Sequence, residues 1–186
     1  MISPLLSQAF FGQMKHHLLK DADWSVYSDN TKWTTTALDA IRACCGRFTT
    51  YTQREYLNLD LVGYDRVNNG AGYRRDNWRI RIAIEHENDA NSWSYELCKL
   101  TDVVADLRVL VTYAELGKVD PQTKLQSAIA PIQDRLLEGH TSAWLFVFGP
   151  WRRSQEPYFQ AFTFDTNGEI IRIPDADPLY LPSNVA

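Results

Sequence analysis

Residues 56–113 decide the fold, and they form four successive runs: YLNLDLVGYD (56–65), NWRIRIAIEHEND (77–89), SWSYELCKLTDVVADL (92–107) and RVLVTY (108–113). Apolar and polar residues alternate in the first two runs, which is the pattern of half-buried β-strands. The stretch between them, VNNGAGYRRD, carries Asn and Gly residues that suit a hairpin turn. The third run has helical spacing and the fourth is almost wholly apolar, like a strand buried on both faces. The sequence therefore predicts a β-hairpin followed by a parallel βαβ step.

Acidic residues gather at one end of this predicted hairpin. Counting by twos puts Asp60 on one face of the first strand with Val62, and it puts Glu85 and Glu87 on one face of the second with Ala83. Carboxylates that are pressed together in an apolar sheet repel one another and lose hydration, so they need a cation nearby. A hard divalent metal ion is the natural partner.

Lys99 lies on the helix that is predicted to follow the hairpin. Glu96 precedes it by three residues, so the two side chains can also form an ordinary surface ion pair, which is the alternative to a catalytic role for Lys99. The predicted inner stripe of this helix consists of Trp93, Leu97, Leu100 and Val104.

Length and composition indicate one folded domain over residues 1–186. The hydrophobic fraction of 45% and the aromatic fraction of 12% are ordinary for a globular protein and argue against long disorder. Helical spacing and turn residues predict further elements: helices over 3–20, 34–46 and 121–138, the last interrupted at Pro131, a strand over 143–148, and a hairpin of 158–165 with 169–173 that turns at Asn167-Gly168.

The net charge of −4 excludes a general nucleic-acid coat, so any contact with nucleic acid must be local. Three cysteines, Cys44, Cys45 and Cys98, fit neither a disulfide framework nor a zinc site. We find no signal peptide and no apolar run as long as a membrane span, so we expect a cytoplasmic protein with no membrane partner.

The densest positive patch consists of arginines in the hairpin turn and on its second strand: Arg66, Arg74, Arg75, Arg79 and Arg81. Strand alternation predicts that Arg79 and Arg81 share a face with Glu85, an arrangement that suits an anionic substrate. The alternative is that these arginines pair with neighbouring carboxylates such as Asp65 and Asp76.

The order of elements and their polar residues resemble the PD-(D/E)xK nuclease superfamily, which has the restriction-endonuclease-like fold. In that family an aspartate on the first hairpin strand and a Glu-x-Lys on the next hold the catalytic magnesium ion and the attacking water. Asp60 matches the aspartate and Glu85 the glutamate, whereas Glu87 stands where the lysine is expected. Variants of the superfamily carry the lysine on the following helix, where Lys99 lies.

The resemblance covers about residues 34–148, with a C-terminal hairpin and tail over 149–186 as an addition. It implies a mixed α/β sheet with flanking helices and a Mg²⁺- or Mn²⁺-dependent endonuclease that hydrolyses phosphodiester bonds, with DNA favoured over RNA and a homodimer allowed. The implied roles are metal binding by Asp60, Glu85, Glu87 and the carbonyl of His86, steering of water or phosphate by Lys99, and phosphate binding by Arg74, Arg75, Arg79 and Arg81. Strand parity turns the His86 side chain to the other face, as a packing residue.

An alternative function stays open from the same residues. Glu87 in place of a lysine, together with the net acidity, favours a scaffold that keeps the nuclease fold but binds a protein or nucleic acid without cutting it. Trp151, beside Arg152 and Arg153, would then belong to the contact surface.

Overall fold

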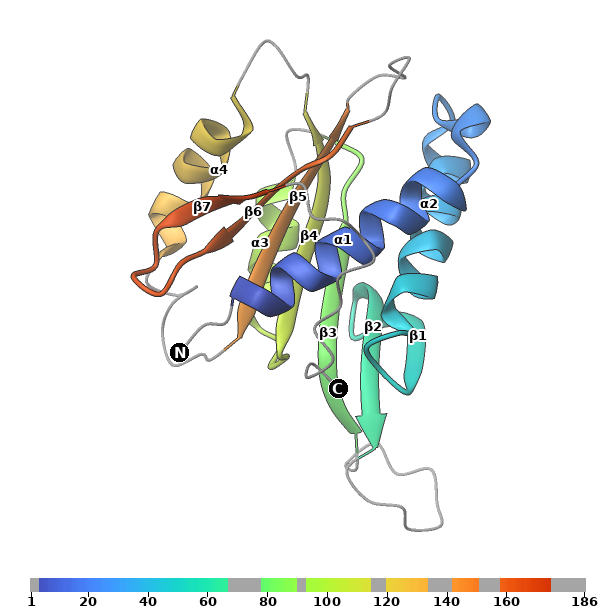
Figure 1. The fold of residues 1–186 in the computed structure, drawn as a ribbon, viewed down its shortest axis with the longest axis horizontal. Coiled ribbons are helices and arrows are strands. Elements are labelled where there is room, and N and C mark those ends of the chain that lie inside the picture. Colours follow the sequence, from blue (N-terminus) through green and yellow to red (C-terminus); the bar gives the residue numbers. More distant parts are fainter. Residues whose placement is uncertain are drawn as a thin grey trace.

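The fold is built on a seven-stranded mixed sheet in which the strands lie side by side in chain order (Figure 1). The structure is a computed structural model that describes residues 4–66, 78–89, 93–114, 120–133, 142–150 and 158–174. The predicted α/β class is confirmed. The strands are β1 (Tyr51–Tyr56), β2 (Leu59–Arg66), β3 (Trp78–His86), β4 (Leu107–Ala114), β5 (Ala143–Pro150), β6 (Gln160–Phe164) and β7 (Ile170–Ile173).

The central strands of the sheet pair in parallel, and the strands toward each edge pair in antiparallel fashion. Strand β3 pairs with β4, and β4 with β5, in parallel, whereas β1, β2 and β3 form one antiparallel group and β5, β6 and β7 another. Every residue of β4 and β5 is buried, which explains why their sequences lack polar alternation. The predicted hairpin and the βαβ step that follows it are both confirmed.

Helices cover both faces of the sheet. The α-helices are α1 (Pro4–Lys20), α2 (Asn30–Cys45), α3 (Trp93–Thr101) and α4 (Pro121–Ile129), with short 3-10 turns at η1 (Trp24–Val26) and η3 (Ala130–Ile132). In Figure 1, α1 crosses in front of the strands and α3 lies behind them. One apolar cluster joins α1 and α2 to the sheet and a second joins α3 and α4 to the opposite side. We call these sides the α1/α2 face and the α3/α4 face.

Helix boundaries differ from the prediction where local capping decides them. Helix α2 begins four residues early, because Asp29 is its N-cap and accepts a hydrogen bond from Lys32 N at 3.1 Å. Helix α3 ends at Thr101, so Val104, predicted for its buried stripe, is 77% exposed. The predicted interruption at Pro131 is confirmed, since α4 passes into a 3-10 turn at Ala130.

The last two strands form the predicted hairpin. Its turn uses Gly168 at a φ of 82°, and the Asp165 carboxylate accepts hydrogen bonds from the backbone of Asn167 and Glu169. The sheet also has an edge strand, β1, that we did not predict, because its sequence YTQREY is almost entirely polar or aromatic. Within the described residues, no helix combines the length and the apolar character that crossing a membrane requires.

Candidate active site

A tight turn between β1 and β2 leads directly into the candidate site. Tyr56 pairs with Leu59, so Leu57 and Asn58 form a two-residue loop, and both have positive φ, 53° and 62°. That conformation belongs to the hairpin turn whose twist matches the strands, and it is unfavourable for leucine. Asp60 follows as the second residue of β2. The turn therefore fixes where Asp60 enters the sheet.

Asp60 and Glu85 are cross-strand neighbours on the α3/α4 face. Val62 pairs with Ala83, and Leu61 pairs with the next residue of β3, so the same register places Asp60 opposite Glu85. Asp60 Oδ2 accepts a hydrogen bond from the backbone N of His86 at 2.8 Å, which ties the half-buried aspartate to β3. The predicted convergence of these two carboxylates from adjacent strands is therefore present.

Lys99 reaches this pair from α3. Its Nζ lies 2.9 Å from Glu85 Oε1, forms an ion pair with Glu96, and donates to the carbonyl of Asn58 at 3.1 Å. The Glu85 side chain is 1% exposed and that of Lys99 24%. Although the ion pair is close, neither Glu85 oxygen has a partner of good hydrogen-bond geometry among the described residues. Lys99 therefore reaches from α3 to the buried Glu85 and to the β1–β2 turn.

The cluster carries more negative than positive charge. The pKa of Glu85 is raised to about 9, chiefly because the group is buried; Lys99 opposes the shift, and repulsion by Asp60 and Glu96 adds to it. Burial alone would lower the pKa of Lys99, but the Glu96 and Glu85 carboxylates outweigh it, so the pKa is raised. One ammonium group therefore pairs with two carboxyl groups, Glu85 and Glu96, while Asp60 also repels Glu85, and the cluster favours uptake of a proton or a second cation.

The donor set fits magnesium or manganese better than a metal that needs many protein ligands. Within the described ranges, no three His, Cys, Asp or Glu side chains form a metal-binding group. Magnesium, however, retains several waters and needs only one or two carboxylates from the protein. Asp60 and the buried carboxyl group of Glu85, whose Oε1 faces Lys99 and whose Oε2 has no hydrogen-bond partner among the described residues, meet that requirement. These two residues would hold such an ion.

Glu87 makes a local contact of its own, and it forms no three-carboxylate group with Asp60 and Glu85 in the part of the chain that the structure describes. Strand β3 ends at His86, and the backbone N of Glu87 donates to Val111 O at 2.9 Å. Glu87 Oε1 accepts a hydrogen bond from the backbone N of Asp89 at 2.7 Å, so its carboxylate caps the turn that follows the strand. The structure does not bring Glu87 together with Glu85 and Lys99.

A β-bulge moves the strand arginines off the face that Glu85 occupies. Ile80 and Ile82 pair with adjacent residues of β2, so Arg81 between them is the extra residue. Ile80 packs on the α3/α4 face and Ile82 on the α1/α2 face. The predicted alternation that placed Arg79 and Arg81 beside Glu85 is therefore wrong, because a bulge reverses the parity of every residue beyond it.

These arginines have carboxylate partners instead. Arg79 Nη2 lies 2.7 Å from Asp106 Oδ1, Arg81 Nη1 lies 2.8 Å from Asp65 Oδ2, and Arg81 also binds Asp106. Asp65 in turn accepts hydrogen bonds from Thr50, in the loop after α2. Of the two interpretations that the sequence left open, these contacts match pairing with neighbouring acids. Arg74, Arg75 and Asp76 lie outside the described residues.

The His86 side chain belongs to a buried network on the α1/α2 face, as strand parity predicts. Its Nε2 lies 2.7 Å from Tyr113 Oη, which accepts a hydrogen bond from Trp33 Nε1 at 2.6 Å. Burial lowers the pKa of His86 to about 4, so the imidazole is neutral near pH 7. The network holds β3, β4 and α2 together directly behind the His86 amide that binds Asp60.

Glu96 is the residue of the cluster to which the sequence assigned no site role. Its spacing from Lys99 predicted the ion pair, and that pair exists. The pair lies against the buried Glu85 rather than on an open surface, since the Glu96 side chain is only 15% exposed. The Glu-x-x-Lys spacing could have predicted this site role for Glu96, because it lies on the helix that crosses over the acidic strand ends.

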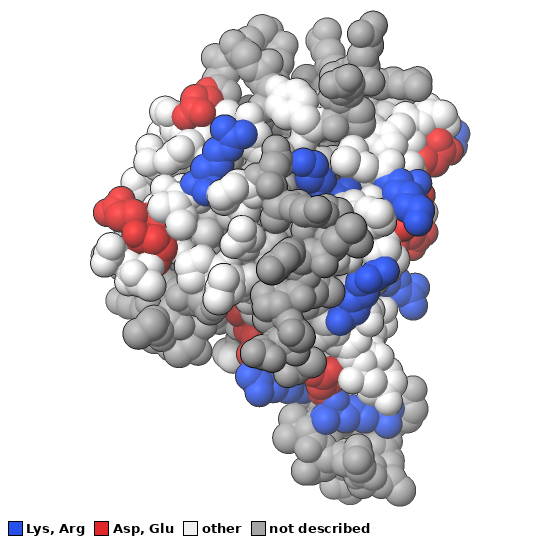
Figure 2. Space-filling model, in the orientation of Figure 1, with Lys and Arg blue, Asp and Glu red and all other residues white. Residues whose placement is uncertain are grey.

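The charge distribution agrees with local rather than general attraction of anions. Figure 2 shows basic and acidic side chains interspersed on the face that α1 covers, with no continuous basic surface among the described residues there. The net charge of −4 points the same way.

Comparison of the chain with protein-family models found no matching family, and comparison with curated proteins found no matching relative. The fold and the site geometry therefore carry the functional argument alone.

Proposed function

We propose that the protein is a Mg²⁺- or Mn²⁺-dependent nuclease that hydrolyses phosphodiester bonds, with DNA as the favoured substrate. One observation supports this proposal most directly: Lys99 Nζ lies 2.9 Å from the buried carboxylate of Glu85, with Asp60 opposite on the adjacent strand. The order of sheet and helices around that contact agrees with a restriction-endonuclease-like core. An acid pair on a hairpin with a lysine beside it is what the PD-(D/E)xK resemblance implies.

Each residue of the cluster has a distinct proposed role in hydrolysis. Asp60 and Glu85 would hold the metal ion, and both are fixed, Asp60 by the His86 amide and Glu85 by burial and Lys99. When bound, the ion supplies Lewis-acid polarisation of the phosphate and lowers the pKa of a water molecule. The Lys99 ammonium is positioned by its ion pair with Glu96 and its hydrogen bond to the Asn58 carbonyl. It would stabilise negative charge on the phosphate in the transition state.

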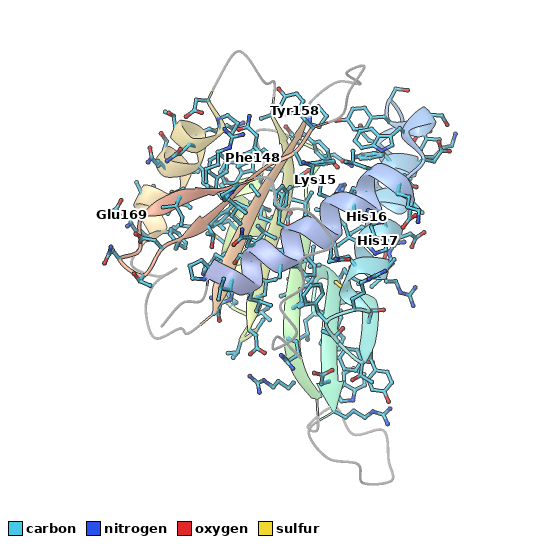
Figure 3. All side chains as sticks on the ribbon, viewed as in Figure 1. Lys15, His16, His17, Phe148, Tyr158 and Glu169 are labelled. Atoms are coloured by element: carbon cyan, nitrogen blue, oxygen red, sulfur yellow. The ribbon has the colours of Figure 1, made fainter. Side chains whose placement is uncertain are left out.

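Asp60→Asn and Glu85→Gln test this assignment, because each removes one negative charge and keeps the shape of the side chain. We expect each variant to lose Mg²⁺-dependent cleavage of labelled DNA, supplied both single-stranded and as a duplex, while its circular dichroism spectrum stays unchanged. Glu169→Gln is the matched control: Glu169 is exposed in the β6–β7 turn, well away from the cluster (Figure 3). Cleavage that persists in both site variants would exclude the catalytic assignment.

A non-catalytic scaffold is the second candidate, and two observations favour it. Glu87 caps its own turn instead of joining the site, and Lys99 already provides a cation for Glu85 without a metal. Calorimetric titration with Mn²⁺ separates the candidates. Binding that is lost in Asp60→Asn but kept in Glu169→Gln supports the nuclease, and absence of binding at millimolar Mn²⁺ supports the scaffold.

A further inference from the structure

A row of aromatic rings lies across β1, β2 and β3. Tyr51 stacks on Tyr64 with ring centroids 5.5 Å apart and 21° between planes, and Tyr64 stacks on Trp78 at 4.1 Å and 17°. Tyr56 also lies near Trp78, with ring centroids 5.9 Å apart and 40° between planes. We call these four rings the aromatic row. They come from three different strands, so the folded sheet brings them together.

The aromatic row shares the α3/α4 face with the acidic cluster. Tyr56, Tyr64 and Trp78 pack against the same apolar cluster as Val62, the residue of β2 that lies two positions from Asp60 on that face. Tyr64 follows Asp60 by four residues, about 13 Å along an extended strand. The row and the proposed metal site therefore lie on the same face of the sheet, with the buried Val62 between them.

The outer end of this row is open in the part of the chain that the structure describes. Helix α3 packs on β3 and β4, and α4 packs on β7, whereas β1 is the edge of the sheet beyond both helices. Tyr51 is 38% exposed, and Tyr56 and Trp78 are half-buried. Tyr64, in the middle of the row, is only 7% exposed, so Tyr51 at the sheet edge is the ring that can accept a planar group from outside.

A cation stands at the same end. Arg66 Cζ lies 4.9 Å from the centroid of the Tyr51 ring. Flat aromatic faces combined with a guanidinium group are the elements with which proteins bind unpaired nucleobases and their phosphates. An aliphatic or acidic peptide would need a different surface, either an apolar groove or a broad basic patch.

We propose that the aromatic row binds single-stranded nucleic acid by stacking on its unpaired bases, and that it delivers this strand to the Asp60–Glu85 site. The inference deepens the proposed nuclease function and rests on it for the second half. Base faces are accessible in a single strand and hidden in a duplex, so the row selects the unpaired form. Stacking also explains how a protein of net charge −4 can hold nucleic acid with few phosphate contacts.

The test is a binding measurement without metal, by fluorescence anisotropy of a labelled thymidine oligonucleotide in the presence of a chelator. We expect the single strand to bind more tightly than a duplex of the same length, and Tyr51→Ala to weaken single-strand binding about 5- to 100-fold. Tyr51→Phe, which keeps the ring, should bind like the wild type. Tyr158→Ala is the control, since Tyr158 is 43% exposed just before β6, several strands away from β1 (Figure 3).

Two results would overturn the inference: equal affinity for single strand and duplex, or unchanged binding by Tyr51→Ala. Because the measurement involves no cleavage, it separates this inference from the proposed activity. Single-strand binding that depends on Tyr51, in a protein that cleaves nothing, would keep the aromatic row as a binding surface and refute only the nuclease.

Discussion

Glu85→Gln should make the protein more stable at alkaline pH, even though it removes a central residue of the site. The pKa of Glu85 rises from 4.5 to about 9 on folding because the carboxyl group is buried near Asp60 and Glu96. Below about pH 4.5 the group is protonated in both the folded and the unfolded chain, so it causes no loss. Between the two values the folded chain keeps a proton that the unfolded chain has released, so the free energy of unfolding falls as pH rises.

The size of this effect follows from the shift. At 1.36 kcal/mol per pKa unit, a rise from about pH 5.5 to about pH 8.5 could lower the free energy of unfolding by at most about 4 kcal/mol. The pKa of about 9 already includes the opposing effect of Lys99; local relaxation reduces the charge penalty further, so we expect a measured loss of about 1–3 kcal/mol in the wild type relative to Glu85→Gln. Glutamine has nearly the same shape and does not titrate.

Urea denaturation in a chelating buffer, at several pH values across that range, measures the difference. The wild type, Glu85→Gln and the exposed control Glu169→Gln are compared, because groups that titrate elsewhere contribute equally to all three. We expect the wild type and the control to lose stability together while Glu85→Gln stays flatter. Parallel curves for all three proteins would show that folding does not raise the pKa of Glu85. The proposed electrostatics of the site would then be wrong.

Three further substitutions test the surroundings of the site. Lys99→Met leaves Glu85 without its ammonium partner and should raise the pKa of Glu85 further, so in urea denaturation we expect the variant to lose more stability at about pH 9.5, above the wild-type pKa of about 9, than at about pH 7; an equal loss at both pH values would contradict the ion pair. Tyr113→Phe removes the acceptor of the buried Trp33 N–H and should cost about 1–3 kcal/mol in the same assay, whereas a change within error would show that the network is dispensable. Leu57→Gly relieves a positive φ and should raise thermal stability by about 0.5–1 kcal/mol, and a lowered melting temperature would show that the leucine makes a contact that outweighs the strain.

The sequence predicted those parts of the fold that depend on hydrophobic periodicity. The alternating run at 77–89 and the almost wholly apolar run at 108–113 became the expected strands β3 and β4, and the crossover between them is the expected helix. Strand β1 was missed because its side chains are polar or aromatic, and its place is set by pairing with β2 rather than by an apolar pattern of its own.

The candidate site was predictable only as far as strand parity held. Asp60 and Glu85 lie on the regular side of the β-bulge, so counting by twos placed them correctly on one face. The bulge at Arg81 and the end of β3 at His86 cannot be read from alternation, and for this reason the arginines and Glu87 were placed with the cluster although their contacts lie elsewhere. The contact between Lys99 and Glu85 depends on how α3 crosses the strand ends, which only the packed structure gives.

A crystal of the protein soaked in Mn²⁺, with the ion located by its anomalous scattering, tests the central claim most directly. We expect one manganese ion bound by the carboxylates of Asp60 and Glu85. The Lys99 ammonium should then remain paired with Glu96. A crystal saturated with manganese in which no ion lies between Asp60 and Glu85 would contradict the claim.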